Sequence, residues 1–422
     1  MTTPQASAQT AFAQHRITRL ATQLPVHRAF HWLHLHQSQI RLWQLEFVAI
    51  PAPPFAEQQR AQWFAERFEA LGLTNVHVDA EGNALGELLP DDGSGEAAAL
   101  ASTLLLSAHL DTVFPAGTDT VPREDGARIL APGVCDNGAG LSALLGLIAA
   151  LKFAGIRPPL PILFAANVGE EGHGDLRGMR HLFTRGSYKG RIAAALALEG
   201  SGTSSVVTRA LGSRRFRVTV DGPGGHSWSD AGTPNPITLI ARALASLADL
   251  PTLSLASHGP RTTLSPGVIS GGTSINVIPS SASVELDLRS TDATQLDLLS
   301  DAVERTFAAV VETANQKQSV PVLLTIDTIG NRPAGELPDD APLLHTLRAV
   351  DRHLGLRTET RIGSTDANLP LSLGIPAIAL ASGGTGGGIH TLGEWYDPTG
   401  RETALRRILL TLLDTAQTLP EQ

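Results

Sequence analysis

Side chains of the types that bind divalent cations stand in short stretches far apart in the sequence. They are His109 and Asp111, Asp136, Glu170 and Glu171, Glu199, and His390. Imidazole nitrogen and carboxylate oxygen are donors that suit zinc, and manganese or cobalt could substitute. Whether these residues can share a metal site depends on the elements that carry them.

His109 and Asp111 follow an apolar stretch, Ser102–Ala108, which we predict to be a strand. In extended backbone, side chains two residues apart point the same way, so Asp111 can hold the His109 ring. A metal-bound histidine usually gives its other ring N–H to such a carboxylate. Taken alone, the two residues could equally be a surface pair at the end of a strand.

Asp136 lies in the turn Gly133–Gly140, between extended chain and a predicted helix. The glycines of this turn let backbone and ligand approach closely, although Asp is also a common helix cap at such a position. Glu170 and Glu171 close another strand, where adjacent side chains diverge, so one can bind metal while its neighbour faces bound water. Paired glutamates are otherwise most often solvated.

Glu199 and His390 complete the set. Glu199 ends a further strand, and in open α/β sheets the carboxyl ends of the strands form the site. His390 follows a glycine-rich loop, Gly383–Gly388, in which no Lys-Ser or Lys-Thr follows the glycines. Phosphate binding by this loop is therefore disfavoured, and we predict that His390 is a metal ligand.

The charges of these side chains balance if two zinc ions bind. We predict that His109, Asp136 and Glu199 hold one ion. Asp136, Glu171 and His390 would hold the other. Two Zn²⁺ bring four positive charges, the three carboxylates remove three, and a bridging hydroxide makes the site neutral. Such a balance favours ionised water near neutral pH, because metal binding lowers the pKa of water to ~7.

The stretches that position these residues alternate between apolar strands and amphipathic helices. The predicted strands are Asn75–Val78, Ala84–Leu88, Ser102–Ala108, Pro161–Asn167, Ala193–Leu198 and Pro376–Ala381. Helical spacing covers Trp32–Phe47, Phe64–Leu71, Gly138–Leu151, Asp175–Thr184, Pro342–Leu354 and Arg401–Ala416. We expect an α/β fold with a mixed, mostly parallel sheet covered by helices on both faces. The weakly patterned N-terminal segment, about twenty-five residues, is expected to be partly frayed.

The pattern changes after Ser213. The predicted elements there are strand Arg214–Val220, helix Pro236–Leu247, strands Thr262–Ile269 and Ala282–Arg289, helix Leu296–Ala314 and strand Pro321–Asp327. This β-α-β-β-α-β order is that of ferredoxin-like units. We predict a domain of residues 212–330, inserted into a catalytic domain that comprises residues 1–211 and 331–422.

Composition narrows the classes of function. The chain of 422 residues is long enough for two domains. Its 41 Asp and Glu outnumber its 32 Lys and Arg, and the net charge of −9 argues against binding nucleic acid. The single cysteine cannot form an internal disulfide, and no apolar stretch approaches a signal peptide or a membrane span. We therefore expect a cytoplasmic protein with no membrane partner.

The motifs together resemble a known family. HLDT at His109, CDNGAG around Asp136, the Glu170-Glu171 pair, Glu199 and His390 are similar to those of the co-catalytic zinc exopeptidases. That family includes tripeptide aminopeptidase, carboxypeptidase G, aminoacylase and succinyl-diaminopimelate desuccinylase. The resemblance implies a hydrolase with two Zn²⁺ per chain, in which Asp136 bridges the ions, Glu170 is the general base that activates the bridging water, and Asp111 orients His109.

The same resemblance assigns roles in the inserted domain, which in the family acts as a lid or lies against a partner subunit. It implies a homodimer formed through this domain. His226, in GPGGHSW, would stabilise the developing oxyanion, although it could also be a loop histidine held open by glycines. Asn276 and Arg289 resemble positions that contact substrate, and an arginine can clamp a carboxylate. An interdomain ion pair is the alternative for Arg289. Asp366 resembles a residue that shapes the site.

Three functions remain open at this point. The stretches GGHSWSDAGTPNP and EEGHGDLRG look most like tripeptide aminopeptidase-like members, so cleavage of di- and tripeptides is our first prediction. Many peptidases of the family have Asp where Glu199 stands, whereas aminoacylase and desuccinylase relatives carry Glu. A deacylase of N-acyl amino acids is therefore the alternative. A metal-binding scaffold without catalysis is disfavoured, because Glu170 and Asp111 are both present.

Overall fold

The computed structural model describes residues 4–90, 102–248, 250, 260–316 and 320–419. The chain divides into two compact units. The first comprises Met1–Ala210 and Glu336–Gln422, and the second comprises Leu211–Gly335. Among the described helices, none is both long enough and apolar enough to cross a membrane.

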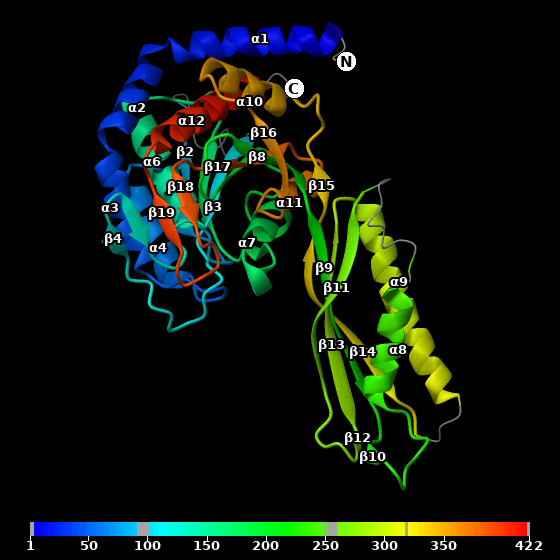
Figure 1. Ribbon diagram of the computed structural model, residues 1–422. Helices are drawn as coiled ribbons and strands as arrows, with labels where there is room; N and C mark the ends of the chain where they lie inside the picture. The colour runs from blue at the N-terminus through cyan, green and yellow to red at the C-terminus, as the bar shows by residue number, and fades with distance from the viewer. Residues whose placement is uncertain (1–3, 91–101, 249, 251–259, 317–319, 420–422) are drawn as a thin grey trace. The chain divides into compact units, whose positions relative to one another are not determined.

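A mixed sheet forms the centre of the first unit (Figure 1). Within the described residues it has nine strands, in the order β1 (Thr74–Val78), β2 (Ala84–Leu88), β6 (Ile162–Asn167), β3 (Thr103–His109), β7 (Ile192–Glu199), β17 (Ala377–Ala381), β8 (Ser205–Ala210) and β15 (Gly335–Glu336), with β16 (Glu359–Gly363) beside β8. The neighbours β6, β3, β7 and β17 run parallel, as do β8 and β16. The pairs β1–β2, β2–β6 and β17–β8 are antiparallel. The predicted α/β fold with a mostly parallel central sheet is confirmed.

The parallel strands end together, and this brings the polar residues that follow them to one edge. Every residue of β3 and β6 is buried, as expected for strands covered on both faces. His109 pairs with Asn167 across β3 and β6. Glu199 pairs with Ala381 across β7 and β17. The carboxyl ends of four neighbouring strands therefore lie side by side.

Helices flank this sheet. They are α1 (Pro4–Ala21), α2 (Leu24–Leu35), α3 (Gln37–Val48), α4 (Gln58–Ala70), α6 (Gly138–Ala154), α7 (Arg177–Arg180), α10 (Pro342–His353), α11 (Asn368–Ser372) and α12 (Arg401–Thr418), with short turns of 3-10 helix at Gly172–Gly174 and of π-helix at His181–Arg185. Figure 1 shows α6 and α12 on one side of the central strands and α7 and α11 on the other. Helix α6 packs against β3 and β7, and α4 packs against β1, β2 and β6.

Two expectations about the N-terminal part need correction. The stretch Trp32–Phe47 is not one helix, because α2 ends at Leu35 and α3 begins at Gln37. The break lies at His36, whose ring stacks on Trp32 and whose Nδ1 lies 2.9 Å from the Trp32 carbonyl oxygen. Residues 4–21 form α1 rather than a frayed segment. This helix packs on α10 and α12, and its Arg16 pairs with the buried Asp414 at 2.9 Å.

A second, small antiparallel sheet lies in the same unit. Its order is β18 (Thr385–Gly387), β19 (Trp395–Asp397), β5 (Arg128–Leu130) and β4 (Arg123–Asp125). Strand β5 precedes the turn that carries Asp136, and the segment between β18 and β19 carries His390. The pairing of Trp395 with Leu130 therefore joins two stretches that hold predicted metal ligands.

Among its described residues, the second unit has a four-stranded antiparallel sheet and two long helices. The sheet order is β11 (Thr262–Gly271), β13 (Ser281–Ser290), β9 (Gly212–Asp221) and β14 (Leu323–Arg332). The helices are α8 (Pro236–Ala248) and α9 (Ala293–Asn315), and β10 (Gly225–His226) pairs separately with β12 (Val277–Ile278). Burial alternates along β13, because one face of the sheet packs on α8 and α9 around its own apolar core.

Candidate metal centre

The ends of β3 and β7 place an imidazole among carboxylates. His109 is buried, and its Nε2 lies 3.1 Å from Asp136 Oδ1 and 3.4 Å from Glu199 Oε1. All three side chains offer ligand atoms within 4.8 Å of one another. The group is the one that the sequence assigned to the first ion.

His390 forms a second group with the other oxygen of Asp136. Its Nε2 lies 3.2 Å from Asp136 Oδ2 and 3.0 Å from Glu171 Oε1. These ligand atoms also lie within 4.8 Å of one another, and a further grouping joins His109 to Glu170 and Glu171. Each oxygen of the Asp136 carboxylate therefore faces a different histidine, which is the geometry that a bridging ligand requires.

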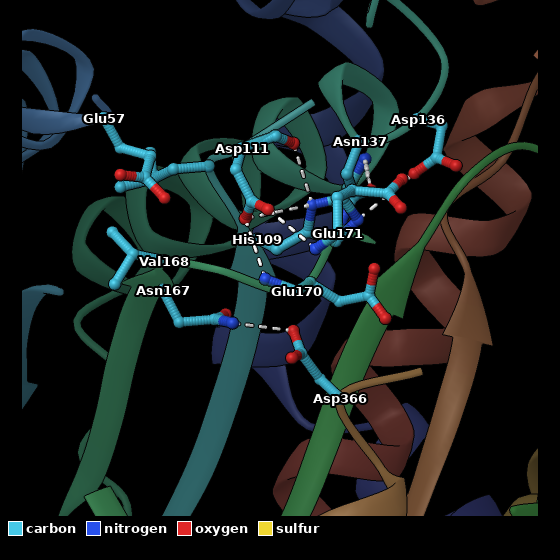
Figure 2. Close-up of polar contacts among 12 residues, drawn as sticks. Glu57, His109, Asp111, Asp136, Asn137, Asn167, Val168, Glu170, Glu171 and Asp366 are labelled. Carbon is cyan, nitrogen blue, oxygen red and sulfur yellow. Dashed lines mark hydrogen bonds and ion pairs between the residues drawn. The ribbon is translucent and has the colours of Figure 1, made fainter. Parts of the chain in front are cut away.

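The Asp111 carboxylate does not hold the His109 ring in the way that the spacing of the two side chains predicted. The Nδ1 of His109 lies 3.0 Å from the backbone carbonyl oxygen of Asp111 and 3.7 Å from its carboxylate. That carboxylate instead accepts hydrogen bonds from the backbone N–H groups of Glu170, at 3.0 Å, and of Glu171, at 2.7 Å. Figure 2 shows it facing the glutamate pair. Asp111 thus holds the His109 ring through its backbone and the glutamate pair through its side chain.

Asn137 fixes the turn that carries Asp136. Its Nδ2 donates to the carbonyl oxygen of Leu198, at 2.8 Å, so the turn is tied to the end of β7. Its Oδ1 accepts from the N–H of Gly140, at 3.1 Å, and of Gly200, at 3.2 Å. Asn137, and not Asp136, therefore caps the helix α6. The Asp136 side chain faces the histidines instead.

Glu394 is a buried side chain at the centre that the sequence did not single out. Its Oε2 accepts from the N–H of Gly133, at 2.9 Å. Its Oε1 accepts from the N–H groups of Cys135 and Asp136, both at 2.8 Å. Glu394 directly precedes β19 and has no motif of its own, and only the fold brings it to this turn.

Glu170 and Asp366 lie beside the two groups. The Oδ2 of Asp366 accepts a hydrogen bond from Asn167 Nδ2, at 2.8 Å. Figure 2 shows this pair below the Glu170 side chain. Burial, together with the charge of Glu170, raises the pKa of Asp366 to about 7. Asp366 therefore contributes polarity next to Glu170 and belongs to none of the ligand groups found among the described residues.

The electrostatics indicate an excess of buried carboxylate. Burial and the nearby charge of Glu170 raise the pKa of Glu171 to about 7, and burial raises that of Glu199 to about 8. Burial alone would lower the pKa of His109, but the carboxylates of Glu199 and Asp136 outweigh it and raise that pKa. Burial would raise the pKa of Asp136, but hydrogen bonds from His109 and His390 hold it below its usual range.

Divalent cations fit this donor set. Buried carboxylates converge on two imidazole nitrogens, and carboxylates left together without a cation are driven toward protonation. Nitrogen and oxygen donors in groups of three that leave positions open are those of catalytic zinc sites. The residues present therefore fit divalent cations, with one candidate group of ligands around each histidine.

The remaining predicted residues lie in the second unit. His226 is exposed, its Nδ1 accepts from the N–H of Trp228 at 3.2 Å, and its own N–H donates to Asp230 Oδ2 at 2.7 Å. Asn276 Oδ1 accepts from Ser274 Oγ at 2.9 Å. Arg289 Nε donates to Asp287 Oδ2 at 2.6 Å, within the second unit. Their roles in substrate binding and oxyanion stabilisation stay predictions.

Comparison with known proteins gives a consistent picture. Residues 105–417 match the sequence profile of Peptidase family M20/M25/M40. A probable carboxypeptidase of Aspergillus clavatus is 26% identical in an alignment 314 positions long, which covers 68% of this chain and 67% of the relative.

Solved structures with the same fold include a tripeptidase of Staphylococcus aureus, with a TM-score of 0.69 and 22% identity over 90% of this chain and 98% of that one. Another is the aminopeptidase PepT of Bacillus cereus, with a TM-score of 0.70 and 21% identity over 90% of this chain and 99% of that one. At these identities the likeness establishes a shared fold. The sequence profile covers every predicted metal ligand, from His109 to His390.

Proposed function

Because the chain belongs to Peptidase family M20/M25/M40, and is therefore a hydrolase, we propose that it is a di-zinc exopeptidase that cleaves di- and tripeptides. One observation carries the proposal. One oxygen of the Asp136 carboxylate lies next to His109 and the other next to His390, so one residue is shared between two groups of ligands. Nitrogen and carboxylate donors of this kind suit zinc.

In this proposal His109 and Glu199 hold one ion with Asp136. Glu171 and His390 hold the second with the other Asp136 oxygen. When bound, the ions would polarise the scissile carbonyl and lower the pKa of the attacking water to ~7. Asn137 keeps Asp136 in place through its bonds to the end of β7.

Glu170 is the proposed general base. It takes a proton from the attacking water and later delivers that proton to the leaving amine. Its backbone N–H is fixed by the Asp111 carboxylate, which also fixes the neighbouring ligand Glu171. A single buried aspartate therefore sets the relative position of the base and one ligand.

The second unit is proposed to act as a lid or as a dimerisation domain. His226 would stabilise the oxyanion, and Asn276 and Arg289 would contact the substrate, as the resemblance implies. Sedimentation equilibrium, run on the full chain, tests the homodimer. A His226→Ala variant tests the oxyanion role, and we expect kcat to fall about 10²- to 10³-fold, as when an oxyanion-hole donor is removed, while zinc content is unchanged.

A panel of substrates, assayed with and without chelator, tests the reaction. Di- and tripeptides with free ends should be cleaved, and N-acetylated and C-amidated versions show which terminus the enzyme requires. N-acetyl and N-succinyl amino acids test the second candidate, a deacylase, which the glutamate at position 199 favours. Activity that survives full zinc removal would refute the metal-dependent mechanism.

A further inference from the structure

We propose that Glu394 is a positioning residue that aims Asp136 between His109 and His390. The inference deepens the proposed function, because it rests on Asp136 being the shared metal ligand. Among the described residues, Glu394 belongs to none of the ligand groups, and its carboxylate bonds to the backbone of the turn that carries Asp136, so it acts on the metal centre through that turn.

The contacts of Glu394 are concentrated on that turn. Three backbone N–H groups, of Gly133, Cys135 and Asp136, donate to its carboxylate at 2.8 to 2.9 Å. Glu394 is 1% exposed. A carboxylate that accepts from N–H groups forms shorter and stronger bonds than neutral acceptors do, and burial keeps water from replacing them. The bonds from the N–H groups of Cys135 and Asp136 fix the two peptide groups that flank Cys135, and the second of these leads directly into Asp136.

The backbone of Glu394 is also bound at this junction. The N–H of Ala131 donates to its carbonyl oxygen at 3.1 Å, beside the pairing of Trp395 with Leu130. Its own N–H donates to the carbonyl oxygen of Thr391 at 3.1 Å, which closes the turn directly after His390. One residue thus links the turn that carries the shared carboxylate to the loop that carries the second histidine.

The turn needs such a constraint because its own conformation is unusual. Gly133 has a φ of +76°, and a Cβ there would collide with the Thr112 side chain. On the other side, Asn137 ties the turn to β7. Glu394 and Asn137 therefore hold Asp136 from both sides, and together they leave its carboxylate little freedom to turn away from the imidazoles.

A charged acceptor is required here, rather than any polar side chain of this size. In a Glu394→Gln variant, one amide oxygen can still accept from two N–H groups. The amide NH₂ then faces the third N–H, donor against donor. The substitution keeps the shape and volume of the side chain but removes one hydrogen bond and the negative charge. A loss of zinc affinity would then be due to the lost hydrogen bond and charge, because packing is unchanged.

The experiment compares Glu394→Gln with a matched control, Asp414→Asn. Asp414 is also a fully buried carboxylate, but it bonds to Arg16 and Thr346 and holds no residue of the metal centre. For both variants, zinc affinity is measured by competition with a chromophoric chelator. The visible spectrum of the cobalt-substituted protein is recorded, and Tm is measured after metal removal.

We expect Glu394→Gln to weaken zinc binding about 10- to 100-fold, the range found when residues behind metal ligands are changed, and to alter the cobalt spectrum. Asp414→Asn should lower Tm while leaving zinc affinity and spectrum as in the wild type. If the wild type itself does not bind two zinc ions, the proposed function fails. If the wild type binds two and Glu394→Gln binds them equally well, or if both variants lose affinity in proportion to Tm, the positioning role is overturned.

Discussion

The two groups of ligands around Asp136 differ in how the fold holds them. In the inner group of His109, Asp136 and Glu199, two ligands, His109 and Glu199, end parallel strands, and the His109 side chain is 1% exposed. The outer group, Asp136, Glu171 and His390, contains a histidine whose side chain is 51% exposed. His390 lies in the loop between β18 and β19 and has a φ of +64°.

The difference indicates which ion should be held more firmly. The inner histidine is fixed by strand pairing and by the Asp111 carbonyl, so little ordering is needed when a metal binds. The outer histidine lies on a loop open to water, and ligands on such loops are less precisely held than ligands on strands. The outer ion is therefore expected to bind more weakly and to exchange faster than the inner one.

Removal of the shared carboxylate should have the largest effect. In Asp136→Ala, both groups lose a ligand and the site loses the charge that separates the two ions, so we expect both zinc ions to be lost and turnover to fall to background. Metal analysis by mass spectrometry and a peptide assay measure this. Cys135→Ala is the control, since this neighbour is buried but belongs to no ligand group found among the described residues. Full retention of one ion in Asp136→Ala would show that Asp136 is not shared.

Replacing the proposed general base, Glu170, should lower the rate of the reaction without changing zinc binding. In Glu170→Gln, we expect kcat to fall about 10²- to 10⁴-fold, the usual contribution of a general base, while both ions remain. Zinc content and kcat are measured on the same preparation. If the variant keeps normal kcat, Glu170 is not the general base. If zinc is lost together with activity, Glu170 also contributes to metal binding.

Single histidine variants test the asymmetry itself. His390→Ala should retain one zinc ion, because the inner group is intact, whereas His109→Ala should lose the inner ion and loosen the other through Asp136. Chelator titration of the wild type should accordingly proceed in two phases. Equal zinc content in the two variants, with a single phase in the wild type, would remove the distinction between an inner and an outer site.

The sequence carried more information on the inner group than on the outer one. Continuous apolar stretches predict β3, β6, β7 and β17, because strands buried on both faces need no polar alternation. Polar residues directly after such strands must meet at one edge. The small sheet of β4, β5, β18 and β19 has strands of three residues, too short for any hydrophobic period to be read.

Long-range backbone contacts account for the parts that could not be predicted. The side chain of Glu394 meets the N–H groups of a turn about 260 positions earlier, and nothing in the neighbouring Gly393 or Trp395 indicates this. Side-chain spacing alone suggested that the Asp111 carboxylate holds the imidazole. In the folded chain its carbonyl does so, because the carboxylate is engaged by Glu170 and Glu171.

The pH dependence of zinc binding is the most modest of the expected effects, and it concerns the outer group. A hydrogen bond to Asp136, together with the charge of Glu171, raises the pKa of His390 from 6.5 to about 9 in protein without metal. Below pH 9 the imidazole therefore carries a proton that zinc must displace, so the affinity of the outer ion should rise with pH, by up to about tenfold per pH unit for one proton, and level off above pH 9. Calorimetry in buffers of different ionisation enthalpy measures the protons released, and His390→Ala should abolish the part due to this group. An affinity that is flat between pH 6.5 and 9 would show that the exposed loop does not hold His390 against its carboxylates, and that the outer group is assembled only by the metal.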